Sequence, residues 1–413
     1  MFGKNLIEIN SKEDYWDKRI SYACFSYFLL SVANSTLKVI CIDASSQAGR
    51  ILSAIFGLLI VFSFLSCIKE VIKRAKSLLI KSYSVFFLLY VFSFLSSILR
   101  GEPTNLIINQ TAFLTFAWWI PVGVFAYSVN KYEILYKTFH YGSYLLWVLL
   151  ILMFVFHPLT IYGTTGYNMF FGFNFVIPTL FHLNEFFQKK NLGYFILIVI
   201  DLLLIIVYAN RGALLPVFFF IVYKYFFDSK FTLSKVGLSI LFCLSIVTFV
   251  FLGDLFLNSV ALVLDDLGIQ SRTLLMMLNG SVTDSTGRND IWNECFNMIA
   301  EKPFWGWGMG GEYYRLAASA ENVDVIDNSY HPHNSLIQHF VYFGVIGGLL
   351  VNLIFIYPFF KFKSISDKYR RNLVIIFAAV AIIPSFISAS NMFIKPAVAI
   401  FLYLFYKEYR IKY

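Results

Sequence analysis

The sequence predicts an all-α membrane protein with many transmembrane helices. Of its 413 residues, 59% are hydrophobic and only 14% are charged, whereas an ordinary soluble domain has roughly 25% charged residues. The chain also holds 47 Phe and 26 Tyr, more than one globular core can bury. Its apolar runs are long enough to cross about 30 Å of hydrocarbon as helices, whereas a membrane β-barrel shows shorter, alternating segments.

About twelve segments have the length and composition of transmembrane helices. The first follows the charged stretch KEDYWDKR and has no small-residue cleavage site, so we expect a retained helix and not a signal peptide. An even number of spans places both termini on one side of the membrane. The predicted spans are residues 20–42, 51–68, 80–99, 106–128, 141–157, 168–187, 193–210, 212–228, 232–257, 334–360, 372–390 and 396–408.

The distribution of Lys and Arg predicts which side holds the termini. Connections on the side of the termini carry 24 of these residues, and the short connections on the other side carry five. Cytoplasmic loops are enriched in Lys and Arg, so the termini are predicted to be cytoplasmic. The same asymmetry accounts for the net charge of +9, and nucleic acid is not expected as a partner.

One connection on the outer side is far longer than the others. Residues 258–333 separate an N-terminal bundle of about nine spans (1–257) from about three C-terminal spans (334–413), and loops of this length are usually functional or disordered. The segment GRNDIWNECFNMIAEKP within it has helical spacing and stops at Pro303. It is expected to lie along the membrane surface, and its apolar face consists of Ile291, Trp292, Cys295, Phe296 and Ile299.

Polar residues meet apolar sequence in HPHNSLIQHFVYFGVIGG, residues 331–348. A partly desolvated His333 at this boundary titrates near neutrality, which suits a general base. The alternative is an interfacial histidine that anchors the helix, with Asn334 as the helix cap. Zinc bound by His331 and His333 is disfavoured because no carboxylate or Cys completes the ligand set at suitable spacing.

Two arginines on the same predicted side favour an anionic ligand. Arg211, in IVYANRGALLP, stands between two apolar runs, and arginine inside a membrane is costly unless it has a partner. Arg288 stands at the start of the amphipathic helix, whose N-terminus also attracts anions. Guanidinium groups bind phosphate through two parallel hydrogen bonds. The simpler alternatives are a surface turn for Arg211 and a solvated side chain for Arg288.

The segment KPFWGWGMGGEYY combines four glycines with two tryptophans. No strand precedes it and no GK[ST] follows it, so it is not a nucleotide phosphate loop. We expect a tight turn that leaves Trp305 and Trp307 at the interface, where they stack on sugars or belong to the aromatic belt. The outer carboxylates form no DxD pair, and the five scattered cysteines show neither zinc nor disulfide spacing. No metal or cofactor is predicted.

These motifs resemble the O-antigen ligase/O-antigen polymerase family of bacterial envelope glycosyltransferases. The resemblance rests on STGR-x3-W, KPFWGWGMGG and HPHN-x9-G-x-x-G in this order, on ANRGALL upstream, and on the span layout. It implies a GT-C-like fold and a glycan donor on undecaprenyl pyrophosphate, without nucleotide or metal. Carried over by position, Arg211 and Arg288 hold the pyrophosphate and His333 assists the acceptor hydroxyl. The accessory residues would be His331, Asn334, Trp305, Trp307 and Arg272.

The resemblance leaves the acceptor open. The GWGMGG and PHN sequences favour a repeat-unit polymerase, whereas the single large loop also fits a ligase that transfers glycan to lipid A–core. A transporter is disfavoured because no half-repeat is visible and Asp201 alone is acidic well inside a span. The expected partners are the lipid-linked oligosaccharide, a glycan acceptor, membrane lipid and a chain-length regulator. The expected location is the bacterial inner membrane, with the active site on the periplasmic face.

Overall fold

A computed structural model describes residues 12–40, 46–102, 111–156, 169–207, 211–227, 259, 262, 288–319, 331–386 and 392–407. All regular structure in these ranges is helical, which confirms the all-α prediction for them. The span predicted over 232–257 and the accessory residue Arg272 lie outside the described residues.

The chain divides into two compact units. Unit 1 comprises Met1–Ser31, Ile51–Gly142 and Arg288–Tyr413, and unit 2 comprises Val32–Arg50 and Ser143–Gly287. Helices α1 (Lys12–Ile40), α2 (Gln47–Leu65) and α5 (Tyr132–Phe156) contribute residues to both units. The candidate site residues on the long loop and at the start of the last spans therefore belong to unit 1, together with the N-terminal helices.

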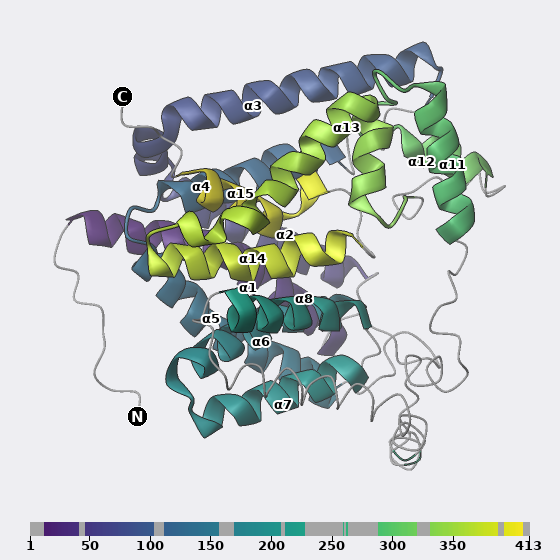
Figure 1. Ribbon diagram of the computed structural model, residues 1–413. Coiled ribbons are helices and arrows are strands. Elements are labelled where there is room, and N and C mark those ends of the chain that lie inside the picture. Colours follow the sequence, from purple (N-terminus) through teal and green to yellow (C-terminus); the bar gives the residue numbers. More distant parts are fainter. Residues whose placement is uncertain are drawn as a thin grey trace. The chain divides into compact units, whose positions relative to one another are not determined.

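The other described helices belong to one unit each, and Figure 1 labels the α-helices. Unit 2 contains α6 (Met169–Lys189), α7 (Leu192–Val207), α8 (Arg211–Val222) and the π-helix η4 (Tyr223–Phe227). Unit 1 contains α3 (Ile68–Leu99), the π-helix η2 (Thr115–Trp119), α4 (Ile120–Ser128), α11 (Arg288–Glu301), α12 (Glu312–Ser319), α13 (Ser335–Lys361), η6 (Phe362–Ser364), α14 (Lys368–Ser385), η7 (Met392–Ile394) and α15 (Pro396–Tyr406).

Five helices in the described ranges are long and apolar enough to cross a membrane: Glu13–Lys38, Gln47–Leu65, Ile68–Leu99, Tyr132–Phe156 and Ser335–Ser364. Shorter apolar helices cover Leu192–Ile205, Gly212–Phe227 and Pro396–Tyr406. All of them overlap predicted spans, so the chain is a polytopic membrane protein. The total of twelve spans and the GT-C-like arrangement remain predictions.

Several helices start earlier than the predicted spans. Helix α3 begins at Ile68 and not at residue 80, so the whole basic stretch KEVIKRAKSLLIK belongs to the helix. The boundary was wrong because Lys, Arg, Glu, Leu and Ala favour helix whether or not they suit lipid. The helix is bent at Ala75, whose φ of −136° and ψ of 24° are not helical.

Helices α4, α14 and α15 form the core of unit 1. Helix α15 packs on both α4 and α14, and almost every side chain of α4 is buried. At Gly123, in α4, the ring of Tyr403 lies where a Cβ atom would stand. Helix α2, by contrast, leaves large apolar side chains uncovered, with Leu58 67% and Phe62 71% exposed. Such a surface suits lipid contact and not water.

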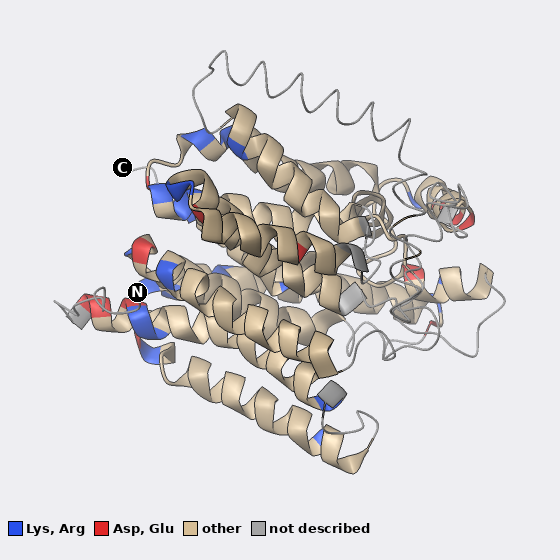
Figure 2. Cartoon of the chain, turned by 90° about the horizontal axis from the view of Figure 1, so that it is seen from below, with Lys and Arg blue, Asp and Glu red and all other residues tan. Residues whose placement is uncertain are grey.

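Charged groups gather around Asp17 at one end of unit 1. The Asp17 carboxylate is fully buried; it pairs with the Arg74 guanidinium and accepts hydrogen bonds from the backbone N–H groups of Asn130 (3.3 Å) and Lys131 (2.8 Å). Arg74 also donates to Glu70 (2.9 Å). These residues come from segments that the sequence assigns to the cytoplasmic side. In Figure 2 most charged residues lie at helix ends, and the middles of the long helices are tan.

Replacing Asp17 by Asn should destabilise unit 1, because Arg74 would keep a largely buried charge without its main partner. Breaking a buried ion pair costs about 3–5 kcal/mol, and we expect a loss near the lower figure because Arg74 keeps its contact with Glu70. The loss of stability is measured as a decrease in the thermal unfolding midpoint in detergent. As a control, Glu133→Gln breaks a pair with Lys137 in which Glu133 is 49% exposed, and it should cost at most about 1 kcal/mol. Equal losses would contradict the assignment.

Candidate active site

Helix α13 is a hairpin of two arms and not one straight span. Gly344 has a φ of 69° and a ψ of −174°, and Figure 1 shows the sharp bend. The Nδ2 group of Asn352 donates to the carbonyl of Leu336 (3.2 Å), and its Oδ1 accepts from His339 Nδ1 (2.7 Å). In a straight helix Leu336 and Asn352 would lie about 24 Å apart. The sequence-based prediction of one continuous span over 334–360 is therefore wrong about its course.

The glycine-rich segment 303–311 pairs with the bend of this hairpin. The N–H of Trp307 donates to the Val341 carbonyl (2.8 Å), that of Gly308 to the Tyr342 carbonyl (3.0 Å), and that of Val345 to the Pro303 carbonyl (2.7 Å). These bonds satisfy backbone groups that the broken helix leaves without helical partners. The predicted tight turn is present, and its backbone pairs with the backbone of α13 at the bend.

Two glycines make this pairing sterically feasible. A Cβ atom on Gly306 would overlap the Tyr342 carbonyl, and one on Gly344 would stand 2.6 Å from the carbonyl carbon of Phe304. Both residues also have positive φ, 67° and 69°, a region that costs other residues energy. Gly348 permits close approach of the two arms at Phe340. The sequence motif ended at Gly347, so it did not include this contact.

The HPHN segment enters the first arm of α13 with a strained residue. His333 is half-buried and has a φ of 54°, a conformation uncommon outside glycine but more frequent for His than for most residues. The next residue, Asn334, caps the helix: its Oδ1 accepts from the N–H groups of Leu336 (2.9 Å) and Ile337 (3.4 Å). The rings of His331 and His333 are 4.2 Å apart between centroids. The predicted capping role of Asn334 is thus confirmed.

Helix α11 joins the STGR-x3-W motif to the HPHN segment. The indole Nε1 of Trp292 donates to the carbonyl of Pro332 (2.7 Å), between the two histidines. Arg288 is the first residue of α11 and precedes Trp292 by four residues, so the two share a helix face. The second turn of α11 therefore contacts the segment that leads into α13. Helix N-termini attract anions.

The buried face of α11 differs from the predicted one at Phe296 and Met298. Cys295 and Met298 are buried with Trp307, Leu316 and Val341, whereas Phe296 is 53% exposed. Ile291 and Ile299 of the predicted face pack against the same cluster. The helix packs against α12 and α13, so its partner within the protein is the first arm of the hairpin.

The two tryptophans of the glycine-rich segment have different environments. Trp305 is 77% exposed, as expected for an interfacial residue, but Trp307 is only 6% exposed. Its Nε1 donates to the Met298 carbonyl (2.8 Å), and Lys302 Nζ lies 4.1 Å from the ring centroid. Burial and the charge of Arg100 lower the pKa of Lys302. The expectation of Trp307 as an interfacial or sugar-stacking residue is wrong, because the ring is inside the packed loop.

The arginines of the predicted clamp belong to different units. Arg288 begins α11 in unit 1, near the HPHN segment, whereas Arg211 begins α8 in unit 2. The convergence of Arg211 with His333 therefore remains a prediction. In the described part of the chain, no group of three or more His, Cys, Asp and Glu side chains could hold a metal ion.

A buried carboxylate that sequence reasoning did not single out lies behind the HPHN segment. Glu312 follows the glycine-rich segment directly and is fully buried. Its Oε1 accepts hydrogen bonds from Gln338 Nε2 (2.6 Å) and the Tyr342 hydroxyl (2.7 Å), both on the first arm of α13. Burial raises the pKa of Glu312 to about 7. Gln338 and Tyr342, four residues apart on an apolar helix, were the available signal.

Unit 2 contains its own buried polar group. Asp201 of α7 accepts from Trp147 Nε1 (2.7 Å) and contacts His182 Nδ1 of α6 (2.8 Å), and both Asp201 and His182 are fully buried. These bonds connect α5, α6 and α7. The acidic residue that the sequence located inside a span therefore has partners within the same unit, and a structural role explains it.

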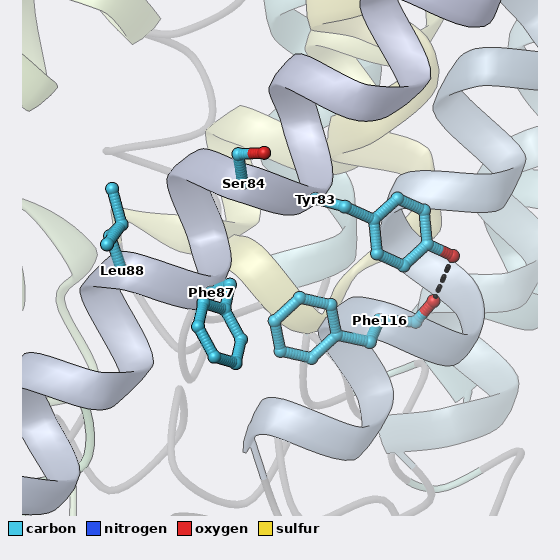
Figure 3. Close-up of a pocket in the computed structure, with 5 residues that line it drawn as sticks. All are labelled: Tyr83, Ser84, Phe87, Leu88 and Phe116. Atoms are coloured by element: carbon cyan, nitrogen blue, oxygen red, sulfur yellow. Dashed lines mark hydrogen bonds between the residues drawn. The ribbon is translucent and has the colours of Figure 1, made fainter.

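An apolar groove lies on α3 and η2 in unit 1. Figure 3 shows its lining, in which the Tyr83 hydroxyl donates to the Phe116 carbonyl (2.9 Å). The groove has a volume of about 660 Å³ and is lined by Tyr83, Ser84, Phe87, Leu88 and Phe116. Farther along α3, Ser93 Oγ accepts from the N–H of Met309 (2.7 Å). The helix that carries the groove thus contacts the glycine-rich segment.

Comparisons with known proteins point to the same part of the chain. Residues 196–352 match a family described as O-antigen ligase. The resemblance to the O-antigen ligase family is confirmed. A protein of Rickettsia conorii named "Putative polysaccharide ligase" is 32% identical over 87 residues. This alignment covers 20% of the present chain and 20% of the relative. No solved structure matches the chain.

The O-antigen ligase segment contains every motif on which the resemblance rests. It includes the ANRGALL turn, α11, the glycine-rich segment and α13 as far as Asn352 on the second arm. The backbone pairing between residues 303–308 and 341–345 lies wholly within it. The spacing of these motifs in the O-antigen ligase segment therefore has a structural cause, the docking of a loop onto a broken helix.

Gly306→Ala should destabilise this docking. The positive φ alone costs about 1–2 kcal/mol, and the overlap with the Tyr342 carbonyl adds to this cost. We therefore expect the free energy of unfolding to fall by at least about 2 kcal/mol. A lower thermal unfolding midpoint of the detergent-solubilised protein would show this loss. Gly57→Ala is the matched control, because Gly57 has open space around it in α2 and Ala favours helix. A Gly306→Ala protein as stable as Gly57→Ala would contradict the pairing.

Proposed function

We propose that the protein transfers an oligosaccharide from undecaprenyl pyrophosphate to a hydroxyl group of a second glycan, at the outer face of the bacterial inner membrane. The observation that carries the proposal is the bond from Trp292 to Pro332. It joins the arginine-bearing start of α11 to the histidine pair before α13. The match of residues 196–352 to the O-antigen ligase family supports the same reaction class.

The transfer requires a base beside the acceptor hydroxyl and cations beside the leaving pyrophosphate. The acceptor hydroxyl oxygen attacks the anomeric carbon, its proton passes to His333, and the bond from that carbon to the pyrophosphate oxygen breaks. A general base contributes typically 10²–10⁴-fold. The leaving pyrophosphate gains negative charge, which Arg288, Arg211 and the N-termini of α11 and α13 would stabilise. The pyrophosphate activates the donor sugar as a leaving group, so no nucleotide is needed, and no metal is proposed.

The donor's polyprenyl chain needs an apolar path that ends near these groups. The groove at Phe87 and Phe116 is open and almost entirely apolar. It lies on α3, which contacts the glycine-rich segment at Ser93. Basic residues near Asp17 and Arg74 stand at the other end of α3. With that end in the cytoplasm, the HPHN segment is on the periplasmic side.

Two acceptors fit this proposal. The polymerase hypothesis rested on GWGMGG and PHN, but backbone pairing and helix capping explain both sequences without reference to the acceptor. Ligation of finished glycan to lipid A–core is the second candidate, and it is favoured by the family description and by the relative's name. Purified protein with a lipid-linked repeat unit distinguishes them. A product ladder indicates polymerase, a single transfer to core indicates ligase, and movement without covalent change indicates a transporter.

His333→Gln should abolish glycan transfer, with a loss of at least about 10²-fold, because the amide cannot accept the acceptor's proton. The protein should remain folded, since Asn334 still caps α13. Product formation from lipid-linked donor measures activity, and the unfolding midpoint measures folding. Product at the wild-type rate from a folded His333→Gln protein would remove His333 from the mechanism.

Arg288→Lys should reduce transfer strongly, because a lysine ammonium is a point charge and does not replace the two parallel hydrogen bonds of guanidinium to phosphate. We expect a loss of about 10-fold or more in kcat/KM for the lipid-linked donor. Arg50→Lys is the control, since Arg50 is an exposed arginine of α2. A similar activity for the two variants would support a solvated role for Arg288.

A further inference from the structure

Glu312 connects the glycine-rich segment to the helix arm that starts at the HPHN segment. It is the first residue of α12 and is fully buried. Its Oε1 accepts from Gln338 Nε2 and from the Tyr342 hydroxyl, and Gln338 Nε2 also lies 2.8 Å from that hydroxyl. Both partners belong to the first arm of α13. The carboxyl group therefore fixes this arm against α12 through two side-chain bonds.

The other carboxylate oxygen has no hydrogen-bond partner among the described residues. Glu312 Oε2 is buried, and the buried hydroxyls of Tyr313 and Ser335 also lack partners within the described part of the chain. Tyr313 is adjacent to Glu312, and Ser335 is the first residue of α13. Polar atoms left in this state are rare in folded proteins and often accompany function. The two bonds at Oε1 are enough to hold α12 against the first arm of α13, so they do not explain the buried, unbonded Oε2.

The bonded arm leads directly to His333. The N–H of Gln338 donates to the Asn334 carbonyl (3.1 Å), and Asn334 caps the same turn through its side chain. His333, with its positive φ, is the residue before this cap. A shift of Gln338 therefore moves the first turn of α13 and the backbone that aims the His333 ring. No intervening flexible segment separates them.

We propose that Glu312 is a positioning residue for His333: as a neutral carboxyl it holds the first arm of α13 in place, and its ionisation loosens that arm. This inference deepens the proposed transfer reaction and rests on it. With its proton on Oε2, the neutral carboxyl still accepts both bonds at Oε1. Ionisation would place a full negative charge in a buried position, which is costly without a partner.

The groups around Glu312 allow this titration near neutral pH. Its neighbours are Tyr342 and Gln338 on α13, Tyr313 on α12, Cys295 on α11 and Tyr90 on α3. None of these is a cation, so no opposite charge offsets burial, which raises the pKa of Glu312 to about 7. The hydrogen bonds from Tyr342 and Gln338 lower it. Because the folded pKa is raised, ionisation destabilises the fold as the pH rises from about 4.5 through 7.

Glu312→Gln separates positioning by charge from simple packing. The amide oxygen can still accept from Gln338 and Tyr342, so the variant should fold and should be at least as stable as wild type at pH 8. In wild type, Glu312 must keep its proton for activity, so kcat/KM should fall as the pH rises above about 7. In Glu312→Gln, whose amide stays neutral, this alkaline fall should be absent. Glu301→Gln, at an exposed residue paired with Arg315, should keep the wild-type profile.

Tyr342→Phe provides a second test with the carboxyl group in place. Loss of the Tyr342 hydroxyl removes a bond that lowers the pKa of Glu312, so the alkaline limb should move to higher pH. A merely structural role would lower activity without moving the limb. An unchanged alkaline limb in Tyr342→Phe, or a wild-type alkaline fall in Glu312→Gln, would overturn the proposal.

A measurement without substrate keeps this inference apart from the proposed function. The fluorescence of Trp292, taken as the difference between wild type and Trp292→Phe, reports the contact at Pro332. It should change with pH near 7 in wild type and remain constant in Glu312→Gln. A signal independent of pH in wild type overturns the positioning role, whatever the transfer assay shows. Absence of transfer by wild type, with the pH-dependent signal present, would refute the proposed function alone.

Discussion

The structure depends on how one broken membrane helix satisfies its backbone. Helix α13 reverses at Gly344, and such a break leaves backbone groups without their helical partners. The segment 303–308 supplies them through three backbone bonds to residues 341–345. Because these bonds need close approach of two main chains, side chains at Gly306 and Gly344 are excluded. The loop cannot be separated from the hairpin without leaving polar groups unpaired.

The candidate site is a product of this docking. Once the glycine-rich segment is fixed on the bend, α12 starts beside the first arm of α13 and places Glu312 against Gln338. Helix α11 covers the same arm and brings Trp292 to Pro332. The histidines thus stand at a junction where α11 contacts Pro332 and where α12 bonds to the first arm of α13 through Glu312. Residues far from His333 in sequence control its position through this junction.

Sequence reasoning succeeded where one property determines structure. Apolar length identified the helices of the membrane part, and Asn before an apolar run identified the cap at Asn334. It failed where burial depends on a packing partner, because the surface that α11 contacts determines whether Trp307 or Phe296 is buried. The hairpin was missed because an apolar stretch from 334 to 360 has the same composition whether it runs straight or folds back. Glu312 was one acidic residue among several until its partners were known.

The folded-back course of α13 has a consequence for side reactions. Leu336 contacts Asn352, eight residues beyond the bend and so about 12 Å along the second arm. The HPHN segment is therefore recessed from the tip of the hairpin, with His331 buried and His333 half-buried. In the transfer reaction proposed above, an activated sugar held beside His333 would be shielded from bulk water. The recessed site would therefore protect the donor from hydrolysis until the acceptor hydroxyl enters.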